Sequence, residues 1–245
     1  MENKHQVHNL IILDESGSMN SIKPLIINGF NSLIKSINEV EEQFPEQEHL
    51  ISMVTFNSFS NKLQHFLEPV FKLNPLNNEN YSPSSATPLF DAMGFSITKL
   101  KQHLEGKTDY NVLVTILTDG AENCSKEYTG NAIKAMVDEL KDLNWTFTYI
   151  GADHDVEEMA SRMSINNTMS FNKDTAGIEN MFTKERNSRF SYSKKIRAKE
   201  NTCYAFYDED TTVNNVDDKD VVVAAKSNPE EKKPTSLWDK YFKKK

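Results

Sequence analysis

The sequence has 245 residues, of which 38% are hydrophobic and 26% charged, with a formal net charge of −8. These values are typical of globular proteins, and they exclude a collagen-like chain and a chain disordered throughout. The length predicts one domain of roughly 200 residues with an appendage. No apolar run reaches the roughly 18 residues of a membrane-spanning helix, so we expect no membrane span and no secretory signal. The two cysteines, Cys124 and Cys203, form no disulfide framework, which favours a reducing, cytoplasmic location.

The charge is unevenly distributed along the chain. Residues 1–183 hold 13 Lys and Arg against 25 Asp and Glu, a net charge of −12; residues 184–245 hold 15 against 11, a net charge of +4. The acidic body argues against a nucleic-acid partner. Residues 208–235 are polar and too poor in apolar side chains to offset chain entropy, so we predict a linker there. We therefore assign residues 1–200 to a folded domain and residues 201–245 to a polar extension that is expected to be partly flexible.

Short apolar runs alternate with amphipathic stretches through the body of the chain. In chain order, the pattern predicts a strand at 7–13, a helix at 22–37, a strand at 50–56, an edge strand near 62–71, a helix at 89–104, a strand at 112–117, a helix at 133–140, and strands at 145–150 and 168–171. The runs at 7–13 and 112–117 are almost wholly apolar, which is typical of strands covered on both faces. The predicted fold is α/β: a doubly wound, mostly parallel sheet flanked by helices on both faces, with a C-terminal extension.

Oxygen-bearing side chains follow the predicted strands. Asp14, Ser16 and Ser18 come after the first strand, Asp119 follows the strand at 112–117, and Thr87 precedes the helix at 89–104. In open parallel sheets, ligands bind beyond the carboxyl ends of the strands, where these residues are expected to meet. Carboxylates and hydroxyls are hard oxygen ligands suited to Mg²⁺ or Mn²⁺. A mostly neutral coordination sphere with only two or so carboxylates leaves such a cation strongly electrophilic. It would therefore accept an anionic ligand from outside, and an Asp or Glu carboxylate of a protein partner fits that need.

At these positions the sequence resembles the von Willebrand factor type A domain with its metal-ion-dependent adhesion site. The residues that carry the resemblance are Asp14-Glu15-Ser16-Gly17-Ser18, Ala86-Thr87-Pro88-Leu89 and Thr118-Asp119-Gly120, within a similarity over roughly residues 5–190. The Asp-x-Ser-Gly-Ser-Met and Thr-Pro-Leu forms resemble the intracellular bacterial branch of that family. The resemblance implies Mg²⁺ or Mn²⁺ binding and recognition of a ligand carboxylate. It also implies direct metal contacts from Ser16 and Ser18, with Thr87 or Asp119, and water-mediated contacts from Asp14 and Asp119.

Simpler interpretations of the same residues stay open at this stage. Serine before an apolar helix is a common N-cap, which would account for Ser16 and Ser18 without a metal. Three further acidic residues border the expected site, and we assign them to a partner-binding rim: Glu15, Glu122 and Asp153. For Glu15 and Glu122 the alternative is an ordinary solvated position, and for the segment Asp153-His154-Asp155 it is a helix cap at Asp155.

The last residues of the chain form a second candidate interaction element. Leu237, Trp238, Tyr241 and Phe242 fall on one face of a short predicted helix, followed by three lysines. Aromatic anchors beside charge are typical of docking peptides. The alternative is an intramolecular contact in which this segment packs back on the domain.

The sequence favours a non-catalytic, metal-dependent protein-interaction module, an adaptor in a bacterial multi-protein complex. One alternative is a Mg²⁺-dependent phosphohydrolase with Asp14 as the nucleophile. Haloacid-dehalogenase-type phosphatases need a second aspartate two residues further on, where this chain has Ser16. No Ser-His-Asp arrangement or phosphate-binding glycine loop is evident, so no enzymatic activity is expected. A further alternative is a scaffold that acts mainly through its C-terminal docking segment.

Overall fold

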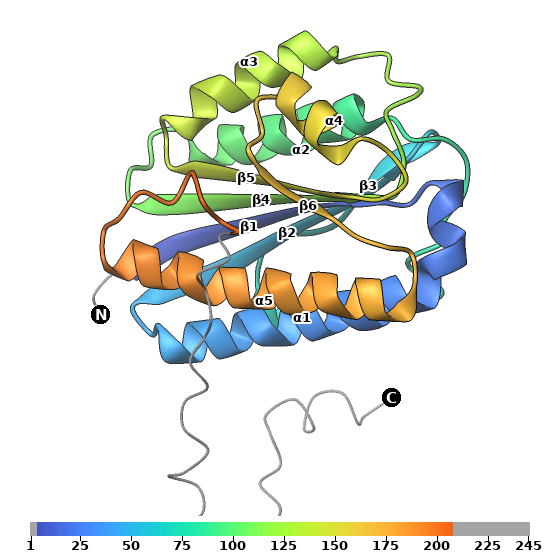
Figure 1. The fold of residues 1–245 in the computed structure, drawn as a ribbon. Helices are drawn as coiled ribbons and strands as arrows, with labels where there is room; N and C mark the ends of the chain where they lie inside the picture. Colours follow the sequence, from blue (N-terminus) through green and yellow to red (C-terminus); the bar gives the residue numbers. More distant parts are fainter. Residues whose placement is uncertain (1–3, 208–245) are drawn as a thin grey trace, which may run out of the picture. The chain divides into compact units, whose positions relative to one another are not determined.

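A computed structural model describes residues 4–207 of the chain. Six strands and five α-helices make up this part (Figure 1). In chain order they are β1 (His5–Asp14), α1 (Lys23–Gln43), β2 (Gln47–Asn57), β3 (Ser60–Pro69), α2 (Leu89–Leu104), β4 (Tyr110–Thr118), α3 (Gly130–Lys141), β5 (Trp145–Gly151), α4 (Val156–Arg162), β6 (Asn167–Ser170) and α5 (Thr175–Arg197), with short 3-10 helices at Gly17–Ile22 and Val70–Lys72.

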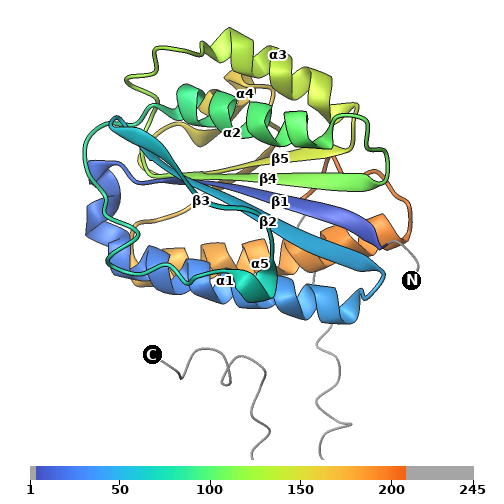
Figure 2. The same cartoon turned by 180° about the vertical axis from the view of Figure 1, so that it is seen from behind.

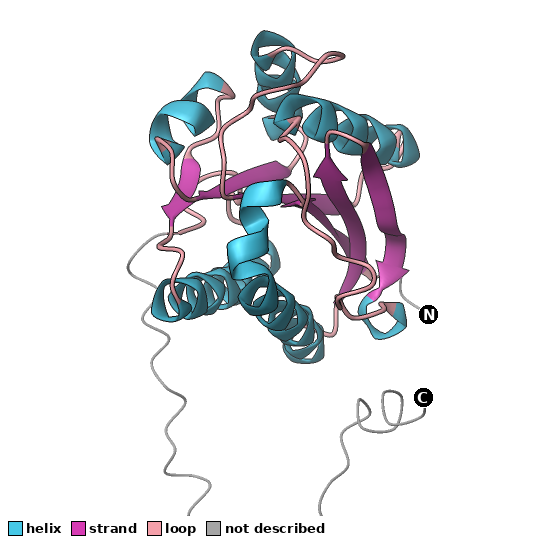
Figure 3. Ribbon diagram, turned by 90° about the vertical axis from the view of Figure 1, so that its right-hand side faces the viewer, coloured by secondary structure: helices cyan, strands magenta, loops and turns pink. Residues whose placement is uncertain are grey.

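The strands of residues 4–207 form one sheet in the order β3-β2-β1-β4-β5-β6, in which β3 is antiparallel to β2 and the other neighbours are parallel. Helices α1 and α5 lie side by side on one face, while α2, α3 and α4 cover the other (Figures 1 and 2). Figure 3 shows the twisted sheet between the two helical layers. The predicted doubly wound α/β fold is confirmed.

The register of the two central strands places the start of the candidate site. Leu13 of β1 pairs with Leu117 of β4, so both strands end at the same edge of the sheet. Asp14 and Thr118 therefore become neighbours although they are far apart in the sequence. Leu10 and Ile12 of β1 are buried in the core with Val112, Val114 and Ile116 of β4 and the apolar face of α2. On the opposite face, Asn9 of β1 and Thr115 of β4 bind the buried Arg189, so a slip of one residue would bring polar side chains into this apolar core.

The last helix, α5, is 23 residues long and carries basic side chains at its carboxyl end. It runs to Arg197, so Lys194, Lys195 and Arg197 form its final turn. Cations are favoured there because the helix dipole places partial negative charge at the carboxyl end. Part of the positive charge in the last quarter of the sequence thus belongs to the folded domain. None of the helices in residues 4–207 combines the length and the apolar character needed to cross a membrane.

A short segment after α5 returns to the domain. Cys203, Phe206 and Tyr207 are buried. The Phe206 N–H donates to Asn167 Oδ1 at 3.0 Å, and the Tyr207 hydroxyl donates to Glu185 Oε2 at 2.6 Å. Residues 201–207, which the sequence division places in the extension, therefore pack against α5 and β6. The candidate docking residues Leu237, Trp238, Tyr241 and Phe242 lie outside the described residues.

His8 of β1 and His49 of β2 are buried in the sheet and are held neutral. Burial, with Lys107 and other nearby cationic groups, lowers the pKa of His8 to about 4. Burial, with the Arg189 guanidinium, lowers the pKa of His49 to about 3. In the unfolded chain a histidine titrates near pH 6.5, so below that pH the unfolded state binds protons that the folded state refuses. Each histidine therefore contributes stability that is present above pH 6.5 and is lost as the pH falls towards its folded pKa.

We expect His8→Leu to reduce this acid sensitivity. Neither ring nitrogen of His8 has a hydrogen-bond partner among the described residues, so the apolar replacement leaves no polar group unpaired. Between pH 7.5 and 5.0 the variant should lose about 2 kcal/mol less unfolding free energy than the wild type, measured by urea denaturation. His154→Gln, which removes a partly buried imidazole in the loop after β5, serves as the control. Equal pH dependence in the wild type and His8→Leu would contradict the expectation.

Candidate metal centre

Asp14, the last residue of β1, lies at the centre of the candidate site and is fully buried. Its Oδ1 accepts a hydrogen bond from the Ser16 N–H at 2.7 Å, and its Oδ2 accepts one from the Thr118 hydroxyl at 2.6 Å. Burial raises the pKa of Asp14 to about 6, although the hydrogen bonds from Thr118 and Ser16 oppose the shift. The backbone oxygen of Asp14 accepts from the buried Tyr81 hydroxyl at 2.7 Å. This carboxylate is thus held in one orientation by donors on both oxygens.

The two serines of the first loop face each other and Asp119. Ser16 Oγ and Ser18 Oγ are 3.1 Å apart, and the Ser18 hydroxyl donates to Asp119 Oδ1 at 2.5 Å. Ser16 precedes the 3-10 helix that starts at Gly17, but its side chain makes no capping hydrogen bond. The Ser16 hydroxyl is therefore directed towards the site and is not used to cap the helix. Asp119, directly after β4, is buried like Asp14.

Thr87 approaches the same group from the loop before α2. Its backbone N–H donates to Asn123 Oδ1 at 3.0 Å, and the Asn123 backbone N–H donates to the Thr87 backbone oxygen at 3.2 Å. These two hydrogen bonds tie the loop before α2 to the loop after β4. A Cβ added at Gly120 would lie 3.6 Å from Thr87 Oγ1 and 3.7 Å from Ser18 Oγ. The absence of a side chain at Gly120 leaves the space beside these two hydroxyls open. The structure thus brings together Asp14, Ser16, Ser18, Thr87 and Asp119.

The chemistry of these donors fits a hard cation. Within residues 4–207 no group of three or more His, Cys, Asp or Glu side chains is placed to hold a metal. The candidate site instead offers two carboxylates, Asp14 and Asp119, and the hydroxyls of two serines and a threonine. Hydroxyl and carboxylate oxygens suit Mg²⁺ or Mn²⁺, whereas a zinc site would need sulfur or imidazole ligands. The residues present therefore fit the divalent cation that the sequence suggests.

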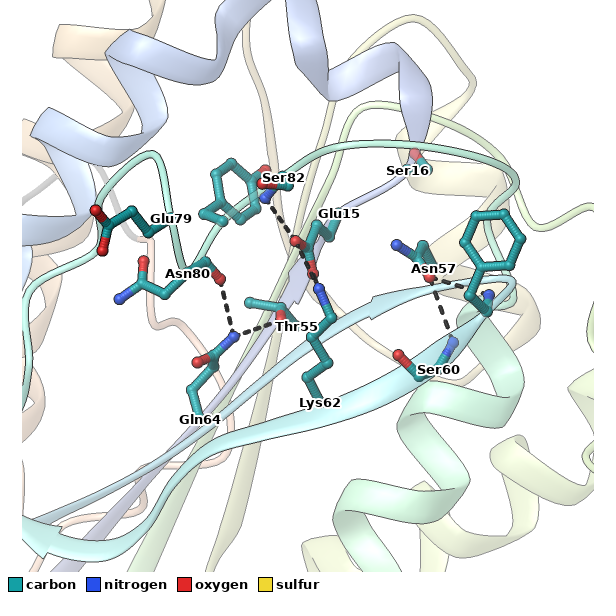
Figure 4. Close-up of polar contacts among 12 residues, drawn as sticks. Glu15, Ser16, Thr55, Asn57, Ser60, Lys62, Gln64, Glu79, Asn80 and Ser82 are labelled. Carbon is teal, nitrogen blue, oxygen red and sulfur yellow. Dashed lines mark hydrogen bonds and ion pairs between the residues drawn. The ribbon is translucent and has the colours of Figure 1, made fainter.

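Glu15 does not lie on a solvated rim, because its side chain is fully buried. Both carboxylate oxygens lie 3.1 Å from Lys62 Nζ of β3, and Oε1 also accepts the Ser82 N–H at 2.6 Å (Figure 4). The Ser84 N–H donates to the Glu15 backbone oxygen at 2.9 Å. Glu15 therefore fastens the loop that carries Thr87 to the ends of β1 and β3. An edge-strand lysine was the sequence signal for this pairing, but only the register of β3 shows which carboxylate it meets.

The Glu122 carboxylate also accepts hydrogen bonds from within the domain. One carboxylate oxygen accepts the backbone N–H groups of residues 124 and 125, and the other accepts the Phe90 N–H at 3.0 Å. Asp91, in the first turn of α2, accepts three backbone N–H groups from residues 126–128. The two carboxylates thus order the loop between β4 and α3 beside the candidate site.

Asp153, the third rim residue, is exposed and meets a cation that sequence reasoning missed. Lys173 Nζ, in the loop between β6 and α5, lies 2.7 Å from Asp153 Oδ2 and 2.7 Å from Asp119 Oδ2. Among the described residues, no group donates a hydrogen bond of good geometry to the buried Asp119 Oδ2. The Lys173 ammonium therefore supplies the positive charge that compensates this carboxylate. Although burial alone would lower it, the adjacent carboxylates of Asp119 and Asp153 raise the pKa of Lys173. The position of Lys173 after a strand end was the one available sequence signal.

Sequence comparison agrees with this arrangement. The family model described as von Willebrand factor type A domain matches residues 10–184. The chain belongs to the von Willebrand factor type A (vWA) domain family. The match runs from the middle of β1 into α5 and includes all five residues of the candidate centre. Among curated proteins, none matches the sequence.

Several solved structures resemble this fold at low sequence identity. The open conformation of the pilus adhesin SpaC from Lactobacillus rhamnosus GG has a TM-score of 0.54 and 13% identity, covering 78% of this chain and 30% of that one. The vWA domain of SpRpn10 has a TM-score of 0.50 and 10% identity, covering 73% and 94%. Proximal thread matrix protein 1 from the mussel byssus has a TM-score of 0.50 and 14% identity, covering 75% and 46%. The chain thus spans less than half the length of the mussel protein, and these likenesses concern the fold.

Proposed function

We propose that this vWA domain is a non-catalytic interaction module that binds Mg²⁺ or Mn²⁺ and, through it, a carboxylate of a protein partner. The observation that carries the proposal is the convergence of Asp14, Ser16, Ser18, Thr87 and Asp119 at one edge of the sheet. Members of the vWA family are generally protein-interaction modules, which supports the same function.

Each residue has a distinct part in the proposed binding. The hydroxyls of Ser16 and Ser18, with Thr87 or Asp119, would hold the cation. Asp14 contributes negative charge, and its orientation is fixed by the Ser16 N–H and the Thr118 hydroxyl. When bound, the cation supplies a Lewis-acidic position that accepts the partner's Asp or Glu side chain. Because the direct ligands would be mainly neutral hydroxyls, the cation would keep part of its charge for this external ligand.

We extend the proposal to an adaptor role in a bacterial, cytoplasmic multi-protein complex. The Asp-x-Ser-Gly-Ser-Met form of the first loop and the Thr-Pro-Leu sequence after it support this assignment. Hydrolysis of a phosphate ester by Asp14 is disfavoured. Its carboxylate is fully buried and both oxygens already accept hydrogen bonds, so it is poorly placed to attack a substrate.

Metal binding by the full-length chain tests the proposal. We expect Ser18→Ala to weaken Mn²⁺ binding about tenfold or more, and Asp14→Asn to weaken it further, measured by isothermal titration calorimetry. Ser18 is exposed, so its replacement should leave the fold intact. Ser32→Ala, which removes an exposed serine hydroxyl from α1, is the matched control.

A second measurement addresses the partner. Proteins captured from the native host by the immobilised wild type should be released by EDTA and should not bind Ser18→Ala, whereas Ser32→Ala should retain them. Unaltered Mn²⁺ affinity in both Ser18→Ala and Asp14→Asn, or partner binding that persists in EDTA, would refute the proposed function.

A further inference from the structure

The candidate metal centre already contains a cation supplied by the chain. The Lys173 side chain reaches it from the loop between β6 and α5 and is 20% exposed. Its ammonium lies 2.7 Å from one oxygen of Asp119 and 2.7 Å from one oxygen of Asp153. The Asp119 side chain is fully buried, whereas that of Asp153 is 63% exposed. Lys173 therefore bridges a buried carboxylate of the site and a solvated one at its edge.

Burial of Asp119 explains why such a cation is needed. An ionised carboxylate removed from water is strongly unfavourable unless a charge or hydrogen bonds compensate it. Asp119 Oδ1 accepts a hydrogen bond from Ser18, and Lys173 lies beside Oδ2. A divalent cation held by Ser18 and Asp119 would lie close to the ammonium, and like charges at such a separation repel each other. The metal and Lys173 are therefore expected to compete for Asp119.

Asp153 offers Lys173 a second partner outside the buried site. It has a left-handed backbone conformation, with φ of 57°, which an aspartate or asparagine adopts more readily than most residues. Since its carboxylate is largely exposed, it needs no compensating charge of its own. The ammonium can keep this contact when it leaves Asp119.

We propose that Lys173 is an internal counter-cation that sets the metal affinity of the domain. In the metal-free domain it neutralises Asp119, and on metal binding it gives up Asp119 and stays with Asp153. Divalent cations then bind more weakly than the donor set alone would allow, and Asp153 partly offsets this by holding the displaced ammonium. This inference rests on the proposed function, because it concerns the regulation of the same site.

Three variants of the full-length chain give a signed test in Mn²⁺ titrations. Lys173→Met should tighten binding about tenfold, because the competing charge is removed. Asp153→Asn should weaken binding several-fold, because Lys173 loses its alternative partner and stays with Asp119. In the double variant the effect of Asp153→Asn should vanish, so its affinity should equal that of Lys173→Met.

Two controls separate charge from side-chain shape. Lys173→Arg keeps the charge and should bind Mn²⁺ as the wild type does. Lys101→Met removes an exposed lysine paired with Glu139 and should have no effect. Thermal unfolding gives a readout that does not depend on metal affinity. In EDTA, Lys173→Met should unfold at a lower temperature than the wild type, because Asp119 is left without a compensating charge. Added Mg²⁺ should then raise the Tm of Lys173→Met more than that of the wild type.

The outcomes distinguish this inference from the proposed function. If the wild type binds Mn²⁺ and Lys173→Met binds no more tightly, or Asp153→Asn does not weaken binding, the role of Lys173 is refuted while the metal site stands. If neither the wild type nor Lys173→Met binds, both proposals fail. Binding by Lys173→Met in the absence of detectable wild-type binding would support the counter-cation directly.

Discussion

Arg189→Met is expected to lower the free energy of unfolding by about 3–5 kcal/mol, the cost of leaving a buried charge without its partner. Arg189 and Glu185, one turn apart on α5, are both buried, with 2.8 Å between Arg189 Nη2 and Glu185 Oε1. The guanidinium also donates to Asn9 Oδ1 of β1 and to the Thr115 hydroxyl of β4, each at 2.7 Å. Its removal leaves the Glu185 carboxylate in the interior with a hydroxyl donor from Tyr207.

Urea denaturation of Arg189→Met measures this cost, and Arg186→Met provides a matched control. Arg186 is on the same helix and pairs with Glu39, but both side chains are about half exposed, so its loss should cost less than about 1 kcal/mol. Replacing both members of the buried pair, in Glu185→Leu with Arg189→Met, should recover part of the stability. If Arg189→Met and Arg186→Met are equally stable, the buried pair does not hold α5 to the sheet.

Gly177→Ala should destabilise the domain by about 2–3 kcal/mol, because the added methyl group overpacks a site bounded by backbone. A Cβ at Gly177 would lie 2.4 Å from the Asn172 carbonyl oxygen and 2.9 Å from Asn172 Cβ. The Gly177 N–H also donates to Asp174 Oδ1, which caps α5. Relief of the clash would require a shift of the loop that carries Lys173.

Gly130→Ala is the matched control for this prediction, because Gly130 also lies in the first turn of a helix. A Cβ there would meet the end of the Phe90 ring at 3.3 Å, and a side chain can give way where a backbone carbonyl cannot. Alanine is also the better helix former by about 1 kcal/mol, so Gly130→Ala should be neutral or stabilising. Thermal and urea unfolding measure the stability of both variants. A Gly177→Ala variant as stable as Gly130→Ala would contradict the steric argument.

Much of the fold could be predicted from the sequence because its signals are local. The apolar runs at 7–13 and 112–117 are the centres of β1 and β4, and the periodic residues at 89–104 correspond to α2. The helices α4 and α5 are not among the predicted elements. The surface of α5 is largely polar, so a hydrophobic pattern does not reveal its length. In α5, Glu185 and Arg189 occupy buried positions that a hydrophobic pattern does not reveal.

The candidate centre shows the same division between local and distant information. Asp14, Ser16 and Ser18 are close in sequence at the end of β1, and a doubly wound fold brings Asp119, directly after β4, and Thr87, directly before the start of α2, to the same edge of the sheet. Glu15, in contrast, is buried against Lys62, and Glu122 is occupied by backbone N–H groups. Each was expected at a solvated rim, because a sequence shows that a carboxylate is present but not which donors surround it.

The sequence by itself determined the α/β fold and the donor residues at the strand ends, since periodicity and short motifs are written in neighbouring residues. Tertiary structure alone decided which distant charges meet: Lys62 with Glu15, and Lys173 with Asp119 and Asp153. The physical reason is that a buried charge is stable only beside a compensating group, and in a crossover topology that group comes from whichever segment the sheet register brings alongside.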